Sequence, residues 1–227
     1  MTETVELRLP ALPRTQVLRG AIDEYERFAE LIAGLDDQAW TRPTRCEGWE
    51  VRDVAGHVAE SAADVIAGTI GQRTADQEAA AGRVRTPTEQ AAFLRSTLAA
   101  FTGLAGALDD AAWRAASPVA GMSIGKGVLT IWFDTYIHAD DIRHAVGLPS
   151  VHGDGLRASL EYVRLELEER GWGPARIEVD DHPAIEVGSG AGPAIRGDAL
   201  EFLLVGTGRL DPGRFGLDET VNVFRAS

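Results

Sequence analysis

The sequence has little cysteine and no long apolar run. Its one cysteine, Cys46, excludes an intramolecular disulfide and a cysteine-rich zinc site. No apolar stretch approaches the roughly 20 residues that a membrane span needs. The first ten residues lack the basic-then-apolar pattern of a secretory signal. We therefore expect a cytoplasmic protein of one or two domains, whose core is large enough to need no disulfide.

Positive charge is also scarce. The chain has 22 basic and 35 acidic residues, a net charge of −13, and neither half is basic. A nucleic-acid-binding protein needs a cationic surface that displaces counterions from phosphates, and an anionic membrane attracts the same kind of surface. We therefore expect small-molecule partners, and neither nucleic acid nor membrane.

Apolar residues recur at helical spacing in four long segments. The expected helices cover residues 14–35, 51–71 and 87–108, and a fourth begins after the glycines of residues 121–127 and runs to residue 147. The third has the clearest start, because Thr86 to Glu89 form a capping box with Pro87 at the first helical position. Four amphipathic helices of roughly 20 residues, each about 30 Å long, predict an antiparallel four-helix bundle.

The pattern changes beyond Pro149. We expect a helix at 154–170, short strands at 175–179 and 184–187, a short helix at 198–205 and a final strand at 220–224. The predicted fold is thus mainly α. Residues 1–150 form the bundle, and residues 151–227 form a small α+β domain.

Two of the five histidines are predicted to face the core of the bundle. His57 follows Asp53 by about one helical turn, and His138 lies on the apolar stripe of the fourth helix. Asp134 precedes His138 by four residues, which places both side chains on one helical face about 6 Å apart. Asp141 extends this stripe by another turn.

Two buried imidazoles and a carboxylate cost several kcal/mol unless they find partners. A divalent metal is one such partner, because two histidines and one carboxylate leave an open fourth position, as in catalytic zinc sites. Asp53 and Asp141 are placed to orient the imidazoles through their second ring nitrogens. Zinc is the first choice, with iron, nickel and manganese as alternatives. The structural alternative is a hydrogen-bonded core histidine and an ordinary Asp–His pair.

Cys46 and Trp49 flank a glycine turn before the second helix. No histidine lies near Cys46 in the sequence to activate its thiol, so we interpret it as a buried packing residue. Trp49 is interpreted as packing at the start of the helix.

Segments 46–58 (CEGWEVRDVAGHV) and 134–143 (DTYIHADDIR) contain these histidines. The first resembles the C-x-G-W-x-V-x-D-v-x-x-H-l signature of the mycothiol-dependent maleylpyruvate isomerase family, within the DinB-like superfamily. The second is similar to that family's acidic-x-x-x-His-x-x-Asp-Ile-Arg pattern. The small domain resembles the family's C-terminal domain around residues 197–199 and 208–209, so the resemblance covers essentially the whole chain.

The resemblance implies a DinB-like bundle that binds a divalent metal, usually zinc, through His57, Asp134 and His138. The isomerase has glutamate at the acidic position, where this chain has the shorter Asp134. The family's C-terminal domain contributes an arginine to the active site, and Arg209 is the positional match. Its guanidinium would clamp a carboxylate, whereas the structural alternative is a surface arginine at the end of the short helix.

The resemblance also implies a function. Mycothiol, the low-molecular-weight thiol of actinobacteria, would take the open metal position, lose its proton and attack an electrophilic small molecule. Loss of the thiol afterwards gives an isomerase, and its retention gives an S-transferase. All but one of the 22 basic residues are arginine, which is compatible with such a genome. Two alternatives use the same residues: a metal-dependent hydrolase that activates water, and a non-catalytic protein that binds a small molecule.

Overall fold

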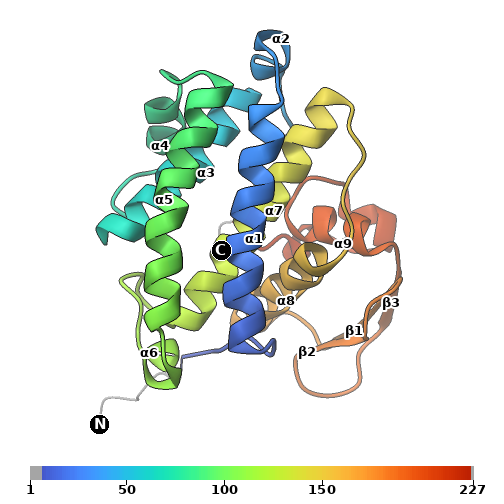
Figure 1. The fold of residues 1–227 in the computed structure, drawn as a ribbon. Coiled ribbons are helices and arrows are strands. Elements are labelled where there is room, and N and C mark those ends of the chain that lie inside the picture. Colours follow the sequence, from blue (N-terminus) through green and yellow to red (C-terminus); the bar gives the residue numbers. More distant parts are fainter. Residues whose placement is uncertain (1–6, 226–227) are drawn as a thin grey trace. The chain divides into compact units, whose positions relative to one another are not determined.

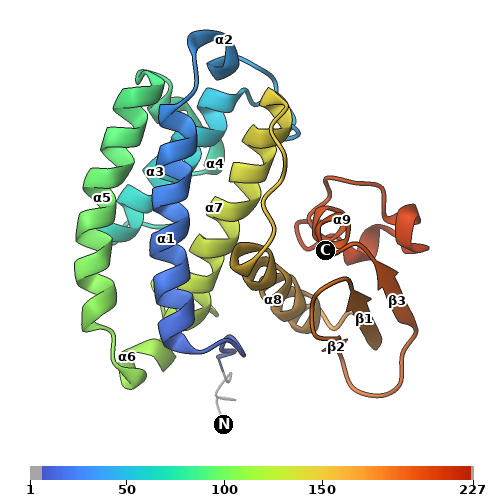
Figure 2. The ribbon, with the colours of Figure 1, turned by 45° about the vertical axis from the view of Figure 1, so that its right-hand side comes forward.

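The computed structural model describes residues 7–225, which form two compact units, one ending at Val151 and the other beginning at His152 (Figures 1 and 2). The first unit is helical. Its elements are α1 (Arg14–Ala33), α2 (Asp37–Trp40), α3 (Val51–Ala67), α4 (Ala75–Gly82), α5 (Pro87–Ala107), α6 (Asp110–Arg114) and α7 (Ile124–Val146).

The four long helices form the predicted bundle. Both α1 and α3 pack against α5 and α7. The colours of Figures 1 and 2 show that α1 and α7 run in one direction and that α3 and α5 run in the other. The mainly helical fold expected from the periodicity is therefore confirmed.

Side chains at the helix starts explain where the long helices begin. At α5 the predicted capping box is present, with the Glu89 carboxylate accepting from the Thr86 N–H at 2.9 Å. At α3 the Asp53 carboxylate accepts from the Glu50 N–H at 2.9 Å. At α7 the Ser123 hydroxyl accepts from a first-turn N–H at 3.0 Å. Each of these bonds satisfies a backbone donor that the helix itself leaves without an acceptor.

The core of the bundle is made of large apolar side chains. Phe28, Leu94, Leu129 and Trp132 are at most 1% exposed. Such burial stabilises the fold by about 1.5–3 kcal/mol for each aliphatic or phenyl side chain. A Cβ at Gly20 would lie 2.1 Å from the Trp132 ring, so this glycine is what lets α1 accept the indole of α7.

Three features of the helical unit differ from the sequence prediction. The fourth predicted helix begins earlier than expected, at Ile124, because the Ser123 side chain caps α7. The second predicted helix was expected to reach Gly71, but α3 ends at Ala67 because Gly68 adopts a left-handed conformation with φ of 71°. Glycine takes this conformation at no steric cost and ends the helix. The short helices α2, α4 and α6 were not predicted, since each is too short to show a clear apolar period.

The second unit is a small α+β fold, as predicted. It contains α8 (Asp154–Glu169), β1 (Ala175–Val179), β2 (Ile185–Val187), β3 (Ala194–Gly197), α9 (Ala199–Gly206) and two 3₁₀ turns, η1 (Pro212–Phe215) and η2 (Glu219–Val221). The strand order is β2-β1-β3. Strand β1 pairs antiparallel with β2 and parallel with β3.

The final strand predicted at 220–224 is wrong. This segment contains the turn η2, and the third strand of the sheet is β3 instead. The Asp218 carboxylate accepts from the Thr220 N–H, and the Asn222 side chain accepts from the Phe224 N–H, each at 2.9 Å. These local bonds give the backbone partners that a strand ladder would otherwise supply.

Between residues 7 and 225, every helix is too short or too polar to cross a membrane.

Candidate metal centre

The three predicted metal ligands lie together in the bundle. Helix α7 presents Asp134 and His138 one turn apart, and the His138 Nε2 atom lies 3.5 Å from Asp134 Oδ1. Helix α3 brings His57 to the other carboxylate oxygen, with 3.4 Å between His57 Nε2 and Asp134 Oδ2. One ligand atom from each residue lies within 4.8 Å of the others. The Asp134 carboxylate thus stands between two imidazoles that both face it with Nε2.

Carboxylates also hold the second nitrogen of each imidazole. His138 Nδ1 lies 3.1 Å from Asp141 Oδ2, and His57 Nδ1 lies 2.7 Å from Glu78 Oε2. A carboxylate accepts a hydrogen bond, so it favours the tautomer with the proton on Nδ1 and leaves the Nε2 lone pair for a metal. Both imidazoles are therefore oriented as ligands.

The distances and the donor set fit a divalent cation. Zinc lies about 2.0–2.2 Å from nitrogen and oxygen ligands, so two ligand atoms of a tetrahedral site are about 3.3 Å apart. The two Nε2–oxygen separations at Asp134, 3.4 and 3.5 Å, are close to this value. They are longer than a normal N–H···O hydrogen bond. His57, Asp134 and His138 therefore have the spacing of ligands around an ion.

Asp134 controls the protonation of both imidazoles. Burial acts to lower the pKa of each histidine, but Asp134, together with Glu78 at His57 and Asp141 at His138, outweighs it, so that the pKa of His57 is raised and that of His138 is raised well above its usual range. Burial acts to raise the pKa of Asp134, but His138 and His57 hold it below its usual range. A cation that binds here replaces protons on the imidazoles, so metal uptake releases protons.

Glu78 was missed by sequence analysis, and two glycines explain how it reaches His57. It lies on α4, which packs against α3. A Cβ at Gly82 would lie 2.2 Å from the Gly56 Cα, and one at Gly56 would lie 2.8 Å from the Ala79 carbonyl oxygen. Only glycines allow this approach. Since Gly56 directly precedes His57, the close contact places Glu78 beside the imidazole.

A local signal could have revealed α4. Thr74 and Gln77 form a capping box at its start, with the Thr74 N–H donating to Gln77 Oε1 at 2.9 Å. This spacing of Thr and Gln is a recognised sign of a helix start. The contact between Glu78 and His57, however, depends on how α4 packs on α3.

The orienting role predicted for Asp53 is wrong. Its carboxylate caps α3 through the Glu50 N–H and accepts from Arg83 Nη2 at 3.0 Å. Burial acts to raise the pKa of Asp53, but its hydrogen bonds from Arg83 and the Glu50 backbone lower it overall. Asp53 therefore stabilises the start of α3, and Glu78 takes the place expected for it beside His57.

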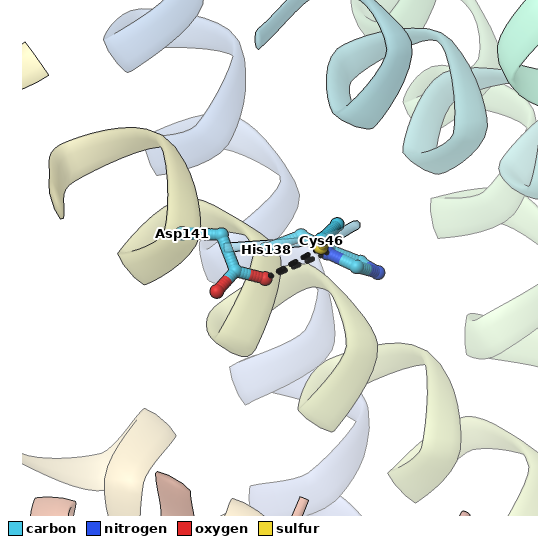
Figure 3. A group of neighbouring side chains, drawn as sticks. All are labelled: Cys46, His138 and Asp141. Atoms are coloured by element: carbon cyan, nitrogen blue, oxygen red, sulfur yellow. Dashed lines mark hydrogen bonds and ion pairs between the residues drawn. The ribbon is translucent and has the colours of Figure 1, made fainter. Parts of the chain in front are cut away.

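Cys46 lies beside His138, so its interpretation as a packing residue alone is wrong. Its thiol donates to Asp141 Oδ2 at 3.2 Å, and its Sγ atom is 3.8 Å from His138 Nδ1. Figure 3 shows the thiol and the carboxylate meeting beside the imidazole. The sequence separation of 92 residues hid this contact.

Cys46, His138 and Asp141 also satisfy the spacing of a metal site. Their geometry is that of a hydrogen-bonded network, because the thiol and the Nδ1 atom both contact one oxygen of Asp141. The other oxygen of Asp141 accepts from Arg45 Nε at 3.1 Å. The His57, Asp134 and His138 cluster is the better candidate, since its two Nε2 atoms face the Asp134 oxygens at ligand spacing while carboxylates already hold both Nδ1 atoms.

Trp49 lies against both imidazoles. Its ring centroid is 5.3 Å from that of His57 and 6.3 Å from that of His138. Its indole N–H donates to Asp76 Oδ1 at 2.9 Å. The predicted packing residue therefore contacts the cluster directly.

Arg209 belongs to the second unit and follows α9. Its backbone N–H donates to the Leu204 carbonyl at 2.7 Å, and its guanidinium lies 3.4 Å from the Thr207 carbonyl. These are contacts of an arginine at the end of a helix, where a cation is favoured. The role of an anion clamp stays a prediction.

Comparisons with known proteins agree with this architecture. The family model described as the mycothiol maleylpyruvate isomerase N-terminal domain matches residues 22–143, just over half of the chain. A crystal structure of the mycothiol-dependent maleylpyruvate isomerase has a TM-score of 0.67 and 16% sequence identity, covering 92% of this chain and 96% of that one. A histidine-to-alanine mutant of that isomerase has a TM-score of 0.65 at the same identity and coverage.

At this identity the likeness to the solved structures is one of fold. A search of curated proteins finds no match. The matched family segment contains His57, Asp134 and His138, and it covers more than half of the sequence. The chain belongs to the mycothiol maleylpyruvate isomerase N-terminal domain family.

Proposed function

We propose that the protein is a divalent-metal-dependent thiol S-transferase or isomerase that uses mycothiol and acts on an electrophilic small molecule. The observation that carries the proposal is the cluster in which His57 and His138 face Asp134 with Nε2 while carboxylates hold both Nδ1 atoms. Membership of a family named for a mycothiol-dependent enzyme supports the choice of thiol.

A divalent metal, zinc in first place, held by His57, Asp134 and His138 would lower the pKa of a thiol at its open position, so that a nucleophilic thiolate forms at neutral pH. Asp134 is the only anion among the three ligands. A divalent ion held by one carboxylate and two neutral imidazoles would keep a net positive charge. This charge would favour an anionic thiolate over a neutral molecule as the fourth ligand. Glu78 and Asp141 keep the imidazoles in the orientation that this requires.

The nucleophile comes from outside the chain. Cys46 is the only cysteine, and its thiol lies on the Nδ1 side of His138, bound to Asp141. The Nε2 side, which faces Asp134, is thus left to a small-molecule thiol. Addition of that thiol to a conjugated double bond forms a carbon–sulfur bond and breaks the π bond, and the thiol's proton passes to the neighbouring carbon. Its later loss restores the double bond, and its retention leaves an S-conjugate.

Elemental analysis of the purified chain tests the metal. We expect about one equivalent of a divalent ion per chain, lost in His138→Ala. The matched control is His144→Ala, an exposed histidine on the same helix, which should keep the ion. Absence of metal from the wild-type chain after reconstitution would overturn the metal site.

Turnover assays test the thiol. Wild-type protein with mycothiol and an activated double bond should give product, and apo-protein or His57→Ala should not. Turnover without any added thiol would instead favour a hydrolase that uses the same site. Retention of an unchanged ligand, as seen by mass spectrometry, would favour a binding protein.

A further inference from the structure

The helical unit encloses a cavity of about 550 Å³ that has His57 and Asp134 in its wall. The rest of the wall comes from α1, α3, α5, α7 and the segment before α7. This volume is typical of pockets that bury a small organic molecule. The cavity therefore offers room for a substrate directly beside the candidate metal cluster.

The wall of the cavity is apolar away from the cluster. Val65, Phe101, Leu104, Val128 and Ile131 line it. Apart from His57 and Asp134, the described residues of the wall carry no charge, and neither lysine nor arginine is among them. Away from the cluster, a carboxylate would lose its hydration without gaining a lysine or arginine as a partner, so this part of the wall has no place for a second anionic group.

The exposure of these side chains shows that the cavity is not closed core. Val65 and Ile131 continue the faces of α3 and α7 that point into the bundle, yet both are only half-buried. Leu104, on α5, is 52% exposed. An apolar ligand that covers this surface is stabilised in proportion to the apolar area that it removes from water.

We propose that this cavity binds the electrophilic substrate, and that the substrate is an uncharged, largely apolar molecule and not a dicarboxylate. The catalytic part rests on the function proposed above, whereas binding in the cavity requires neither metal nor thiol. The substrate's reactive carbon lies at the end of the cavity formed by His57 and Asp134, and its apolar body lies along Val65, Leu104 and Ile131.

Binding is tested with N-phenyl-1-naphthylamine, an uncharged probe that fluoresces in apolar surroundings. We expect saturable binding of one probe per chain to the full-length protein. Val65→Trp, which fills the cavity, should weaken binding at least tenfold. The matched control, Val84→Trp, changes a valine that is 84% exposed and outside the cavity, and it should bind like the wild type.

A second variant guards against misfolding of Val65→Trp. Leu104→Arg alters a position already 52% exposed, so the fold should accept it, and it adds a cation to the wall. The ligand pair is methyl 4-chloro-3-nitrobenzoate and its free acid. In the wild type the ester should displace the probe at a concentration at least tenfold lower than the acid requires. In Leu104→Arg the ratio of these two concentrations should be at least threefold smaller.

The same ester separates the cavity from the chemistry. With thiol present, the sulfur–carbon bond forms as the carbon–chlorine bond breaks, releasing chloride and the thiol proton. Probe binding without this turnover would support the cavity and count against the proposed function. Absence of saturable binding, equal displacement by ester and acid, or wild-type binding by Val65→Trp would overturn the cavity assignment.

Discussion

His57 and His138 face the same carboxylate, but the fold holds them in different ways. In the α7 half of the cluster (Asp134, His138 and Asp141), both carboxylates that contact His138 lie on the same helix, three or four residues from it. In the α3 half (His57 and Glu78), the partner lies 21 residues away on another helix. The first half is thus set by helical geometry, and the second depends on how tightly α4 packs on α3.

The two halves also differ in their support. Asp141 is fully buried and contacts Arg45 and Cys46 in addition to His138. Glu78 is held through the backbone contact between Gly56 and Gly82. We therefore expect the α7 half to resist changes in packing, and the α3 half to respond to them.

The largest effect is expected from Asp134→Ala, which removes the carboxylate shared by both halves. Loss of a residue that only orients a metal ligand typically lowers metal affinity 10–100-fold, and Asp134→Ala should lower it by more than this. Thiol-dependent activity should disappear. Competition with a chelator measures the affinity. Asp23→Ala, at a half-exposed position on α1, is the control and should bind metal normally. Full metal content in Asp134→Ala would show that the shared carboxylate is not a ligand.

Glu78→Gln and Asp141→Asn compare the two carboxylates that hold the Nδ1 atoms of the imidazoles. Each should weaken metal binding by about 10–100-fold, because its imidazole is held less firmly. Only Asp141→Asn should also destabilise the fold, by about 2 kcal/mol, since it leaves the largely buried Arg45 with one carboxylate fewer. Urea unfolding measures the difference. Equal stability of the two variants would contradict the unequal support inferred above.

Gly82→Ala tests the packing of the α3 half without altering any ligand. The new Cβ would meet the Gly56 backbone, move α4 and draw Glu78 away from His57. Unfolding free energy should fall by about 1–3 kcal/mol, and metal affinity should fall toward that of Glu78→Gln.

Gly103→Ala is the matched control for this substitution. It lies in α5 with open space around its Cβ, so it should stabilise the protein by up to about 1 kcal/mol and leave metal binding unchanged. If Gly82→Ala folds and binds metal like the wild type, the glycine contact does not position Glu78.

The same difference explains what the sequence could predict. The bundle and the Asp134–His138 pair follow from helical spacing, which is a local property. The Glu78–His57 contact and the position of Cys46 depend on tertiary packing, and a pattern along one helix does not report it. The end of α3 and the missing strand at 220–224 were decided by single residues, Gly68 and Asp218, whose local conformation outweighed the apolar pattern.

The smallest effect is expected from Cys46→Ala. It removes one hydrogen bond to Asp141, which keeps its contacts with Arg45 and His138. Metal content should stay at about one equivalent, and metal affinity should change by less than about threefold. This change is much smaller than the one expected for Glu78→Gln or Asp141→Asn. Loss of the ion from Cys46→Ala, with retention in His57→Ala, would mean that Cys46, His138 and Asp141 hold the metal. The α3 half would then be the support, and the comparison between the two halves would be reversed.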